Sequence, residues 1–198
     1  AHQQPMSAML KDYLDKASYS SQILVSVIND ILDFSKIEAG KLELENVSFS
    51  LHSILDNLLA VVSLRAQEKN LSVHLEVDPK LPPRIVGDPL RLSQILMNIC
   101  TNAVKFTQQG AINVTIKGMV NQQGDKVVLR IEVEDTGIGM TQSQVDRIFQ
   151  PFTQADGSTN RKFGGSGLGL TIVKQLTELM AGKLKVTSMP NHGSTFVI

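Results

Sequence analysis

Residues 164–180 read GGSGLGLTIVKQLTELM, a glycine-rich turn that leads directly into a helix. Glycines let backbone N–H groups approach an anion, and a helix start adds positive partial charge, so such a turn is typical of phosphate-binding folds. The stretch lacks the P-loop spacing G-x-x-x-x-G-K-[ST] and the glycine spacing of a dinucleotide fingerprint. Two interpretations stay open: a different phosphate cradle, or a turn that only lets the helix pack closely.

Composition excludes several classes of protein. The 198 residues, 42% of them apolar, can bury a sizeable core. Nineteen basic residues balance 19 acidic ones, so no overall field favours nucleic acid or anionic lipid. Cys100, the one cysteine, lies in an apolar run and is expected to be a buried, reduced thiol, which favours a cytoplasmic location. No stretch is long and apolar enough for a membrane span, so any membrane anchor would lie outside this chain.

The first part of the chain predicts one long helix, from Met6 to about Leu44, with Gly40 and the polar run KLELEN indicating fraying or a boundary around residues 40–46. Apolar or small residues recur there in alternating steps of four and three, and a single stripe of this kind needs a partner helix. The stripe comprises Leu10, Leu14, Ala17, Ser21, Leu24, Ile28, Ile31 and Ser35. We predict a helical segment with its linker over residues 1–45 and a second domain over residues 46–198.

The second domain alternates helical and strand patterns. Asp88 and Pro89 form a helix start, and helices are predicted over 53–70 and 89–106. Strands are predicted over 71–77 and, as a hairpin, over 111–120 and 126–135; a helix, the glycine turn with its helix, and strands at 184–188 and 193–198 follow. This order predicts an α+β fold, a two-layer sandwich with helices on one face of a mixed sheet.

Two groups of residues carry candidate chemistry. Asn98, Asn102 and Lys105 share one face of the helix at 89–106, where carboxamide oxygens suit Mg²⁺ and the ammonium suits phosphate, although such a stripe can also simply face solvent. Asp135 ends a predicted strand and precedes Gly137 and Gly139, so it can accept a hydrogen bond from an exocyclic amine beside bare backbone, or it can merely form the turn.

Five motifs in order resemble the N box, first glycine box, F box, second glycine box and last glycine box of sensor histidine kinases. They are NICTNAVKFT, DTGIGM, IFQPFTQAD, GGSGLGLTIVKQL and HGSTF. The stretch NDILDFSKIEAGKLELE also resembles the second dimerisation helix and linker of hybrid histidine kinases. The resemblance implies the Bergerat ATP-binding fold, shared with gyrase and MutL-type ATPases, preceded by a long dimerisation helix.

The resemblance also implies individual roles in binding ATP and Mg²⁺. Asp135 would accept from the adenine amino group, supported by Thr195 through water. Asn98 and Asn102 would hold Mg²⁺ and the phosphates, and Lys105 would contact a phosphate; Asn98 and Lys105 are the candidate catalytic residues. The polar segment between Gln150 and Gly164 would be a lid, disordered without nucleotide. Further implied nucleotide-binding positions are Gly137, Gly139, Phe149, Arg161, Lys162, Gly165, Gly167, Leu168, Gly169 and Leu170. Phe149 and Phe152 can instead fill the core, which is the favoured interpretation for at least one of them, and Arg161 and Lys162 can also be ordinary surface residues.

One part of the family pattern is absent. The acceptor box S-H-E-x-R-T-P-L does not occur, and His2 lies in AHQQPM without the acidic neighbour of such a box. We therefore expect Mg-ATP to donate its γ-phosphate to a histidine on a dimerisation helix outside this chain. The implied partners are that helix, a receiver domain or response regulator, and a second copy paired through the N-terminal helix, with no nucleic acid.

Two other functions stay open. The chain could be a degenerate, nucleotide-binding or dimerising regulatory module. It could also be a gyrase or MutL-type ATPase, which uses a glutamate on the helix that bears the asparagines. The corresponding turn here offers Gln94, and no acidic residue lies between Asp88 and the helix end, which disfavours hydrolysis.

Overall fold

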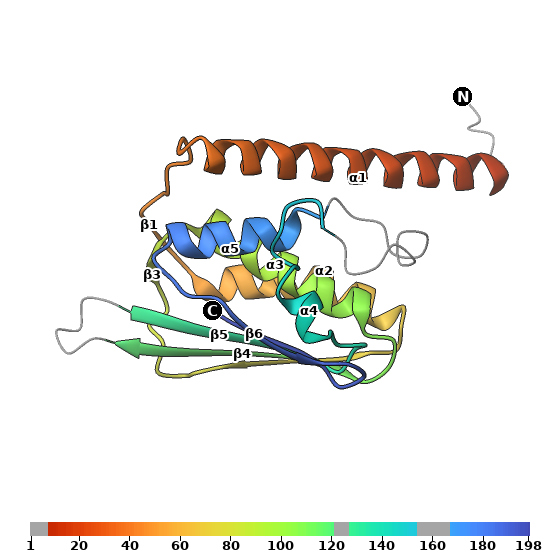
Figure 1. Ribbon diagram of the computed structural model, residues 1–198. Helices are drawn as coiled ribbons and strands as arrows, with labels where there is room; N and C mark the ends of the chain where they lie inside the picture. The colour runs from red at the N-terminus through yellow and green to blue at the C-terminus, as the bar shows by residue number, and fades with distance from the viewer. Residues whose placement is uncertain (1–7, 121–126, 154–166) are drawn as a thin grey trace, which may run out of the picture. The chain divides into compact units, whose positions relative to one another are not determined.

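The computed structural model describes residues 8–120, 127–153 and 167–198 (Figure 1). The chain divides into two compact units, residues 1–42 and 43–198, which are described separately. In the described part of the chain, no helix is both long and apolar enough to cross a membrane.

The first unit is one helix, α1 (Ala8–Glu38), which ends just before the boundary predicted around residues 40–46. Gly40 has a left-handed φ of 62°. Its N–H donates to the carbonyl oxygen of Ile37 at 2.9 Å, and Lys41 N–H donates to that of Lys36 at 2.9 Å. This is a Schellman motif, which satisfies the last carbonyls of a helix and stops it. The apolar stripe along α1 is uncovered: Leu10, Leu14, Leu24, Ile28 and Ile31 are 42–60% exposed.

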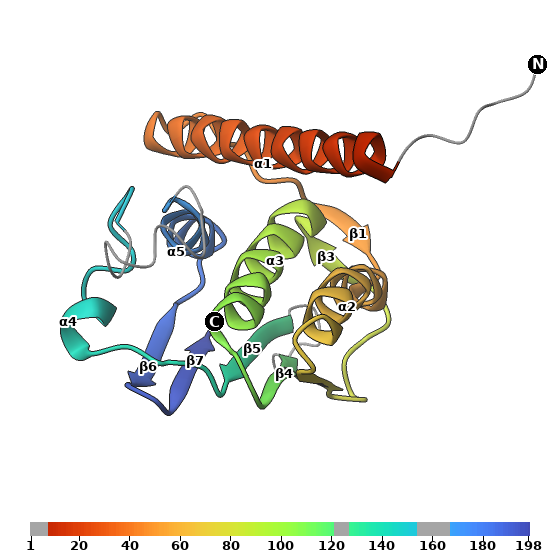
Figure 2. The same ribbon diagram turned by 90° about the vertical axis from the view of Figure 1, so that its right-hand side faces the viewer.

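The second unit is a two-layer sandwich, as predicted. Its five-stranded sheet has the order β2-β4-β5-β7-β6, with β2 parallel to β4 and the other neighbours antiparallel. Helices cover one face of this sheet (Figure 2). The strands are β2 (Ser72–Val77), β4 (Ala111–Val120), β5 (Val127–Asp135), β6 (Lys185–Met189) and β7 (Gly193–Val197), and the helices are α2 (Leu51–Gln67), α3 (Pro89–Phe106) and α5 (Gly169–Leu179).

Three details differ from the predicted elements. A separate two-stranded sheet of β1 (Val47–Phe49) and β3 (Ile85–Gly87) was not predicted, because three-residue strands are too short to show an alternating pattern. The helix expected after Met140 is the single turn α4 (Gln142–Val145). The predicted hairpin turn lies at residues 121–126, outside the described residues.

The core lies between the sheet and the three helices. Alternate side chains of β4 and β5 point into it, as expected for strands with one covered face. The helix α3 contributes its apolar face, which leaves the face of Asn98 turned away from the sheet core. The buried residues of these elements include Ile112, Val114, Ile116, Ile131 and Val133 of the strands and Ile95, Leu96, Ile99, Ile172 and Leu176 of the helices.

Helix α3 is held at both ends. At its start, Asp88 accepts a hydrogen bond from Arg91 N–H at 3.0 Å and Pro89 takes the first position. At its end, Lys69 Nζ donates to the carbonyl oxygens of Val104, Lys105 and Thr107, at 2.7, 2.8 and 3.2 Å. A lysine at a helix C-terminus satisfies carbonyls that have no partner within the helix and opposes the negative end of the helix dipole.

We expect Lys69→Met to lower the free energy of unfolding of the second unit by about 1.5–3 kcal/mol, because it removes charge-assisted hydrogen bonds while keeping an apolar stem. Urea denaturation measures this. Lys117→Met is the matched control, because Lys117 is exposed on β4. Equal stability of the two variants would contradict a capping role for Lys69.

Candidate nucleotide-binding site

Asn98 lies against the start of helix α5. A Cβ added to Gly169 would stand 3.1 Å from Asn98 Oδ1, so the absence of a side chain at Gly169 is what lets the carboxamide come so close. Asn98, Asn102 and Lys105 are all partly buried. The structure therefore brings the asparagine stripe and the end of the glycine-rich turn together.

The start of α5 has the form of an anion site. Leu168 is the N-cap residue, is fully buried and provides no side-chain hydrogen bond to the first N–H groups. Uncapped N–H groups at a helix start carry positive partial charge. Gly167 precedes them with a φ of 71°, packed against the backbone of Phe152. The carbonyl oxygen of Phe149 accepts from Thr171 Oγ1 at 3.1 Å, so Phe149 is joined to α5 through its backbone.

Asp135 is the buried carboxyl group of the site, at the end of β5. Its Oδ1 accepts from Gly137 N–H at 2.8 Å. Burial raises the pKa of Asp135 above its ordinary value, and hydrogen bonds from the backbone of Gly137 and Ser194 partly oppose this shift. A new hydrogen-bond donor stabilises a desolvated carboxylate of this kind more than it would stabilise a carboxylate in water.

The glycines after Asp135 hold the loop in a close-packed position. Gly137 lies against the end of α3: a Cβ there would stand 2.6 Å from the carbonyl oxygen of Phe106, which also accepts from Ile138 N–H at 3.2 Å. Gly139 has a φ of 62°, and a Cβ there would overlap the carbonyl oxygen of Met189. The loop is thus fixed between α3 and the turn that joins β6 to β7.

The strand register corrects the role expected for Thr195. Asp135 is paired with Ser194, whereas Thr195 is paired with Glu134. Because side chains alternate along a strand, Thr195 points to the opposite face of the sheet from Asp135. Ser194 is buried, and its hydroxyl lies 3.0 Å from that of Ser188, which accepts from Met140 N–H at 2.8 Å. Sequence reasoning missed both serines, since only the register shows which residue of HGSTF lies beside Asp135.

Lys105 carries a partly desolvated charge at the end of α3. Burial lowers the pKa of its ammonium group. The Nζ atom lies 4.9 Å from the ring centroid of Phe106, a cation–π distance. An anionic ligand close to Lys105 would restore the charge stabilisation that burial removes.

The remaining candidates are not all described. Arg161, Lys162 and Gly165 lie outside the described residues, as does most of the predicted lid. Among the residues that the structure describes, no three His, Cys, Asp or Glu side chains gather as metal ligands, so a metal ion here would depend on carboxamides and on phosphate oxygens.

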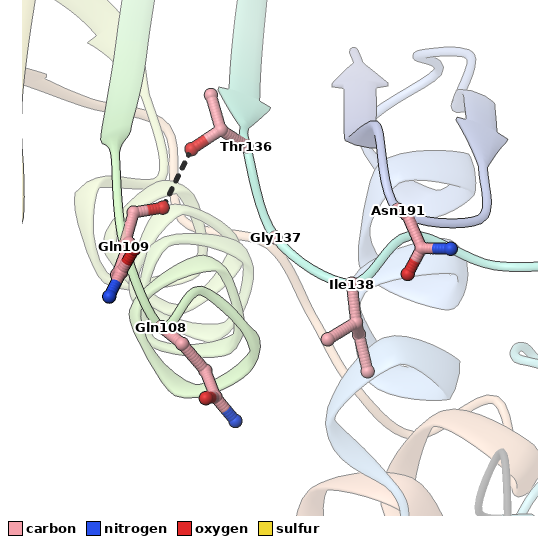
Figure 3. Close-up of a pocket in the computed structure, with 6 residues that line it drawn as sticks. All are labelled: Gln108, Gln109, Thr136, Gly137, Ile138 and Asn191. Carbon is pink, nitrogen blue, oxygen red and sulfur yellow. Dashed lines mark hydrogen bonds between the residues drawn. The ribbon is translucent and has the colours of Figure 1, made fainter.

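A depression of about 230 Å³ lies beside the site but is not lined by the asparagine stripe or Asp135 (Figure 3). Thr136 Oγ1 donates to the carbonyl oxygen of Gln109 at 3.2 Å, which Figure 3 marks with a dashed line. The full lining is Gln108, Gln109, Thr136, Gly137, Ile138 and Asn191. At this size it is smaller than typical ligand sites of roughly 300–1,000 Å³.

Comparison with known proteins gives the class of this fold and site. Residues 87–198 match the model of the histidine kinase-, DNA gyrase B- and HSP90-like ATPases, and the chain belongs to this family. Within the family it is an ATP-binding domain of the histidine kinase type, as its relatives show.

Three similar proteins illustrate this. The sensor histidine kinase GacS of Pseudomonas protegens is 46% identical over 188 residues, which are 94% of this chain and 20% of GacS. Hybrid signal transduction histidine kinase A of Dictyostelium discoideum is 40% identical over 197 residues, 96% of this chain and 9% of that protein. The crystal structure of full-length ShkA with AMPPNP has a TM-score of 0.79 at 32% identity, covering 98% of this chain and 39% of ShkA. The chain thus spans a fifth or less of the two curated relatives.

Proposed function

We propose that this chain binds Mg-ATP and donates the γ-phosphate to a histidine on a dimerisation helix of a two-component phosphorelay kinase. The observation that carries the proposal is the close approach of Asn98 to Gly169, because it brings a carboxamide beside a helix start whose N–H groups no N-cap side chain satisfies. The binding of AMPPNP by ShkA supports it. Phosphoryl transfer needs positioning and charge neutralisation more than covalent chemistry, and such a site offers both.

Each residue has a distinct role in this proposal. Asp135 accepts a hydrogen bond from the adenine amino group, with Ser194 in the supporting position first assigned to Thr195. The N–H groups of Gly169 and Leu170 and the ammonium of Lys105 bind phosphate oxygens. Asn98 and Asn102 offer carboxamide oxygens to Mg²⁺, which when bound would neutralise charge on the phosphates.

The set of residues fits Mg²⁺ together with phosphates better than a metal ion alone. The carboxamide of Asn98 lies beside the start of α5, and the bare Gly169 leaves room next to Asn98 Oδ1 that a Cβ would fill. Arg161 and Lys162 stay candidates for the γ-phosphate, and the segment that contains them stays a candidate lid.

Transfer is favoured over ATP hydrolysis by the residues of α3. Helix α3 contains no acidic side chain that could activate water. Gln94, at the position of the glutamate of gyrase-type enzymes, accepts from Arg91 Nη1 at 2.9 Å. A degenerate module is disfavoured because Asn98, Asn102, Lys105 and Asp135 are all present.

The proposed partners follow from the same arrangement. The exposed stripe of α1, including Leu24 and Ile28, would pair with a second copy and with the helix that carries the acceptor histidine. A receiver domain or response regulator would take the phosphoryl group next. The reduced, buried Cys100 and the use of ATP favour a cytoplasmic location for the domain.

The test uses radiolabelled ATP. We expect this chain alone to bind ATP but to acquire no acid-labile label, because the transfer geometry tolerates errors of only about 1 Å and no acceptor box is present. Adding a dimerisation domain that carries its histidine should give a labelled acceptor. Label on this chain that His2→Ala removes would contradict the missing acceptor, and absence of ATP binding would contradict the proposed function itself.

A further inference from the structure

The chain that joins the two units is anchored on both sides of a very short stretch. On one side, the Schellman motif at Gly40 and Lys41 ends α1. On the other side, Glu45 N–H donates to Asp88 Oδ2 at 3.0 Å. Between these anchors, no hydrogen bond joins residues 42–44 to any other residue that the structure describes.

Asp88 uses both of its carboxylate oxygens, and only one of them serves the helix cap. Oδ1 accepts from Arg91 N–H and Oδ2 accepts from Glu45 N–H, both at 3.0 Å. The residue is only 4% exposed, so an unused oxygen would be costly there. Serine caps a helix about as well as aspartate with a single oxygen. The second oxygen of Asp88 therefore serves the linker and not the cap.

The contacts that follow Glu45 continue the same attachment. Strand β1 pairs with β3, which leads directly into α3, with Val47 opposite Gly87. Arg84 Nη2 donates to the carbonyl oxygen of Ser48 at 2.7 Å, and its Nε donates to Ser48 Oγ at 3.1 Å. From Glu45 onward, the linker is thus tied to the elements that lead into the asparagine helix.

We propose that Asp88 is a positioning residue that fastens the incoming chain to helix α3 and confines the hinge between the two units to residues 42–44. Three extended residues reach at most about 10 Å, so the hinge permits turning with little separation. Because Glu45 is fastened to Asp88 at the start of α3, helix α3 and its asparagine stripe move together with the chain from Glu45 onward. The consequence for phosphoryl delivery rests on the proposed function, whereas the anchor itself does not.

Two variants release the anchor from opposite sides. Asp88→Ser keeps a cap for α3 and loses the acceptor for Glu45, while Glu45→Pro removes the donor and leaves the cap untouched. Spin labels on Lys36→Cys in α1 and Lys117→Cys in β4 report the distance between the units. Cys100 is buried and its pKa is raised to about 12, so it stays unlabelled.

We expect both variants to broaden the distance distribution by about 1.3-fold, because the free stretch grows from residues 42–44 to residues 42–46 and the spread scales with the square root of length. The amide of Glu45 should exchange at least about tenfold faster in Asp88→Ser. The affinity for AMPPNP should stay within about twofold in both variants, which a general disturbance of α3 would not allow. Glu43→Ala, within the hinge, is the control and should change neither the distance distribution, nor the exchange of the Glu45 amide, nor the affinity for AMPPNP.

Unchanged distributions in both variants, or unchanged exchange of Glu45 in a folded Asp88→Ser protein, would overturn the proposal. A loss of AMPPNP affinity in step with the broadening would also overturn it, since Asp88 would then act through the fold of α3. A wild-type chain that binds no AMPPNP would contradict the proposed function, while the distances between the units would still test the anchor.

Discussion

Asp135→Asn is expected to weaken Mg-ATP binding by about 1.5–3 kcal/mol, roughly 10- to 150-fold in Kd. The substitution replaces an acceptor oxygen by an amide donor that faces the adenine amino group. The cost is high because the group is buried at the end of β5, where water cannot replace the lost interaction. Isothermal titration calorimetry with AMPPNP measures the difference.

The fold should survive this substitution. Burial raises the pKa of Asp135, so the ionised carboxylate costs stability in the folded state, and that cost sets in as pH rises from the ordinary value of 3.8 through the folded pKa. A neutral Asn avoids this cost, and we expect a thermal midpoint at pH 7 equal to or above that of the wild type. The same raised pKa predicts that wild-type affinity falls on acidification, as the carboxylate is protonated, while the weaker affinity of Asp135→Asn does not follow that titration. An Asn variant that binds AMPPNP like the wild type would exclude Asp135 as the adenine partner.

Gly193→Ala should abolish nucleotide binding and lower the free energy of unfolding of the second unit by about 2–5 kcal/mol. Gly193 has a φ of 88°, which an L side chain tolerates poorly, at about 1–2 kcal/mol. A Cβ there would also overlap the backbone carbonyl oxygen of Asp135, and overpacking of this kind costs about 1–3 kcal/mol more. The strand that holds Asp135 must move, and Asp135 moves with it.

Chemical denaturation and AMPPNP titration of the same preparation test this. Gly87→Ala is the matched control, because a Cβ there would meet only a side-chain carbon of Phe49, at an ordinary 3.6 Å. We expect that control to lie within about 0.5 kcal/mol of the wild type. A Gly193→Ala protein as stable as the control would show that the β6–β7 turn can yield without disturbing β5.

The elements that sequence predicted best are those specified by neighbouring residues. Helix α3 begins at Pro89 and ends at Phe106, as predicted, because its cap and its apolar period are both local signals. Gly40 likewise indicated the end of α1 to within a few residues, because a glycine that can adopt a left-handed φ is a local stop signal. Strands β1 and β3 went unpredicted because three residues are too few for an alternating pattern, and because their pairing joins Val47 to Gly87, far along the chain.

The same distinction applies to the candidate site. Asn98 and Asp135 follow from motifs, and the structure adds where each of them lies. The choice between Ser194 and Thr195 depends on which residue of β7 pairs with Asp135, and a strand register is a long-range property that a short motif cannot contain. The contact of Asn98 with Gly169 is equally long-range, although both residues belong to motifs.

The packing of Gly167 against Phe152 and Thr153 brings together the two ends of the segment 154–166. The entropy needed to close a segment between touching ends grows only with the logarithm of its length, at about 0.6 kcal/mol for each doubling. Insertions or deletions in this segment are therefore expected to change the free energy of folding little, as long as Gly167 still packs against Phe152 and Thr153. The length of the segment can thus change in evolution without a compensating change in the core.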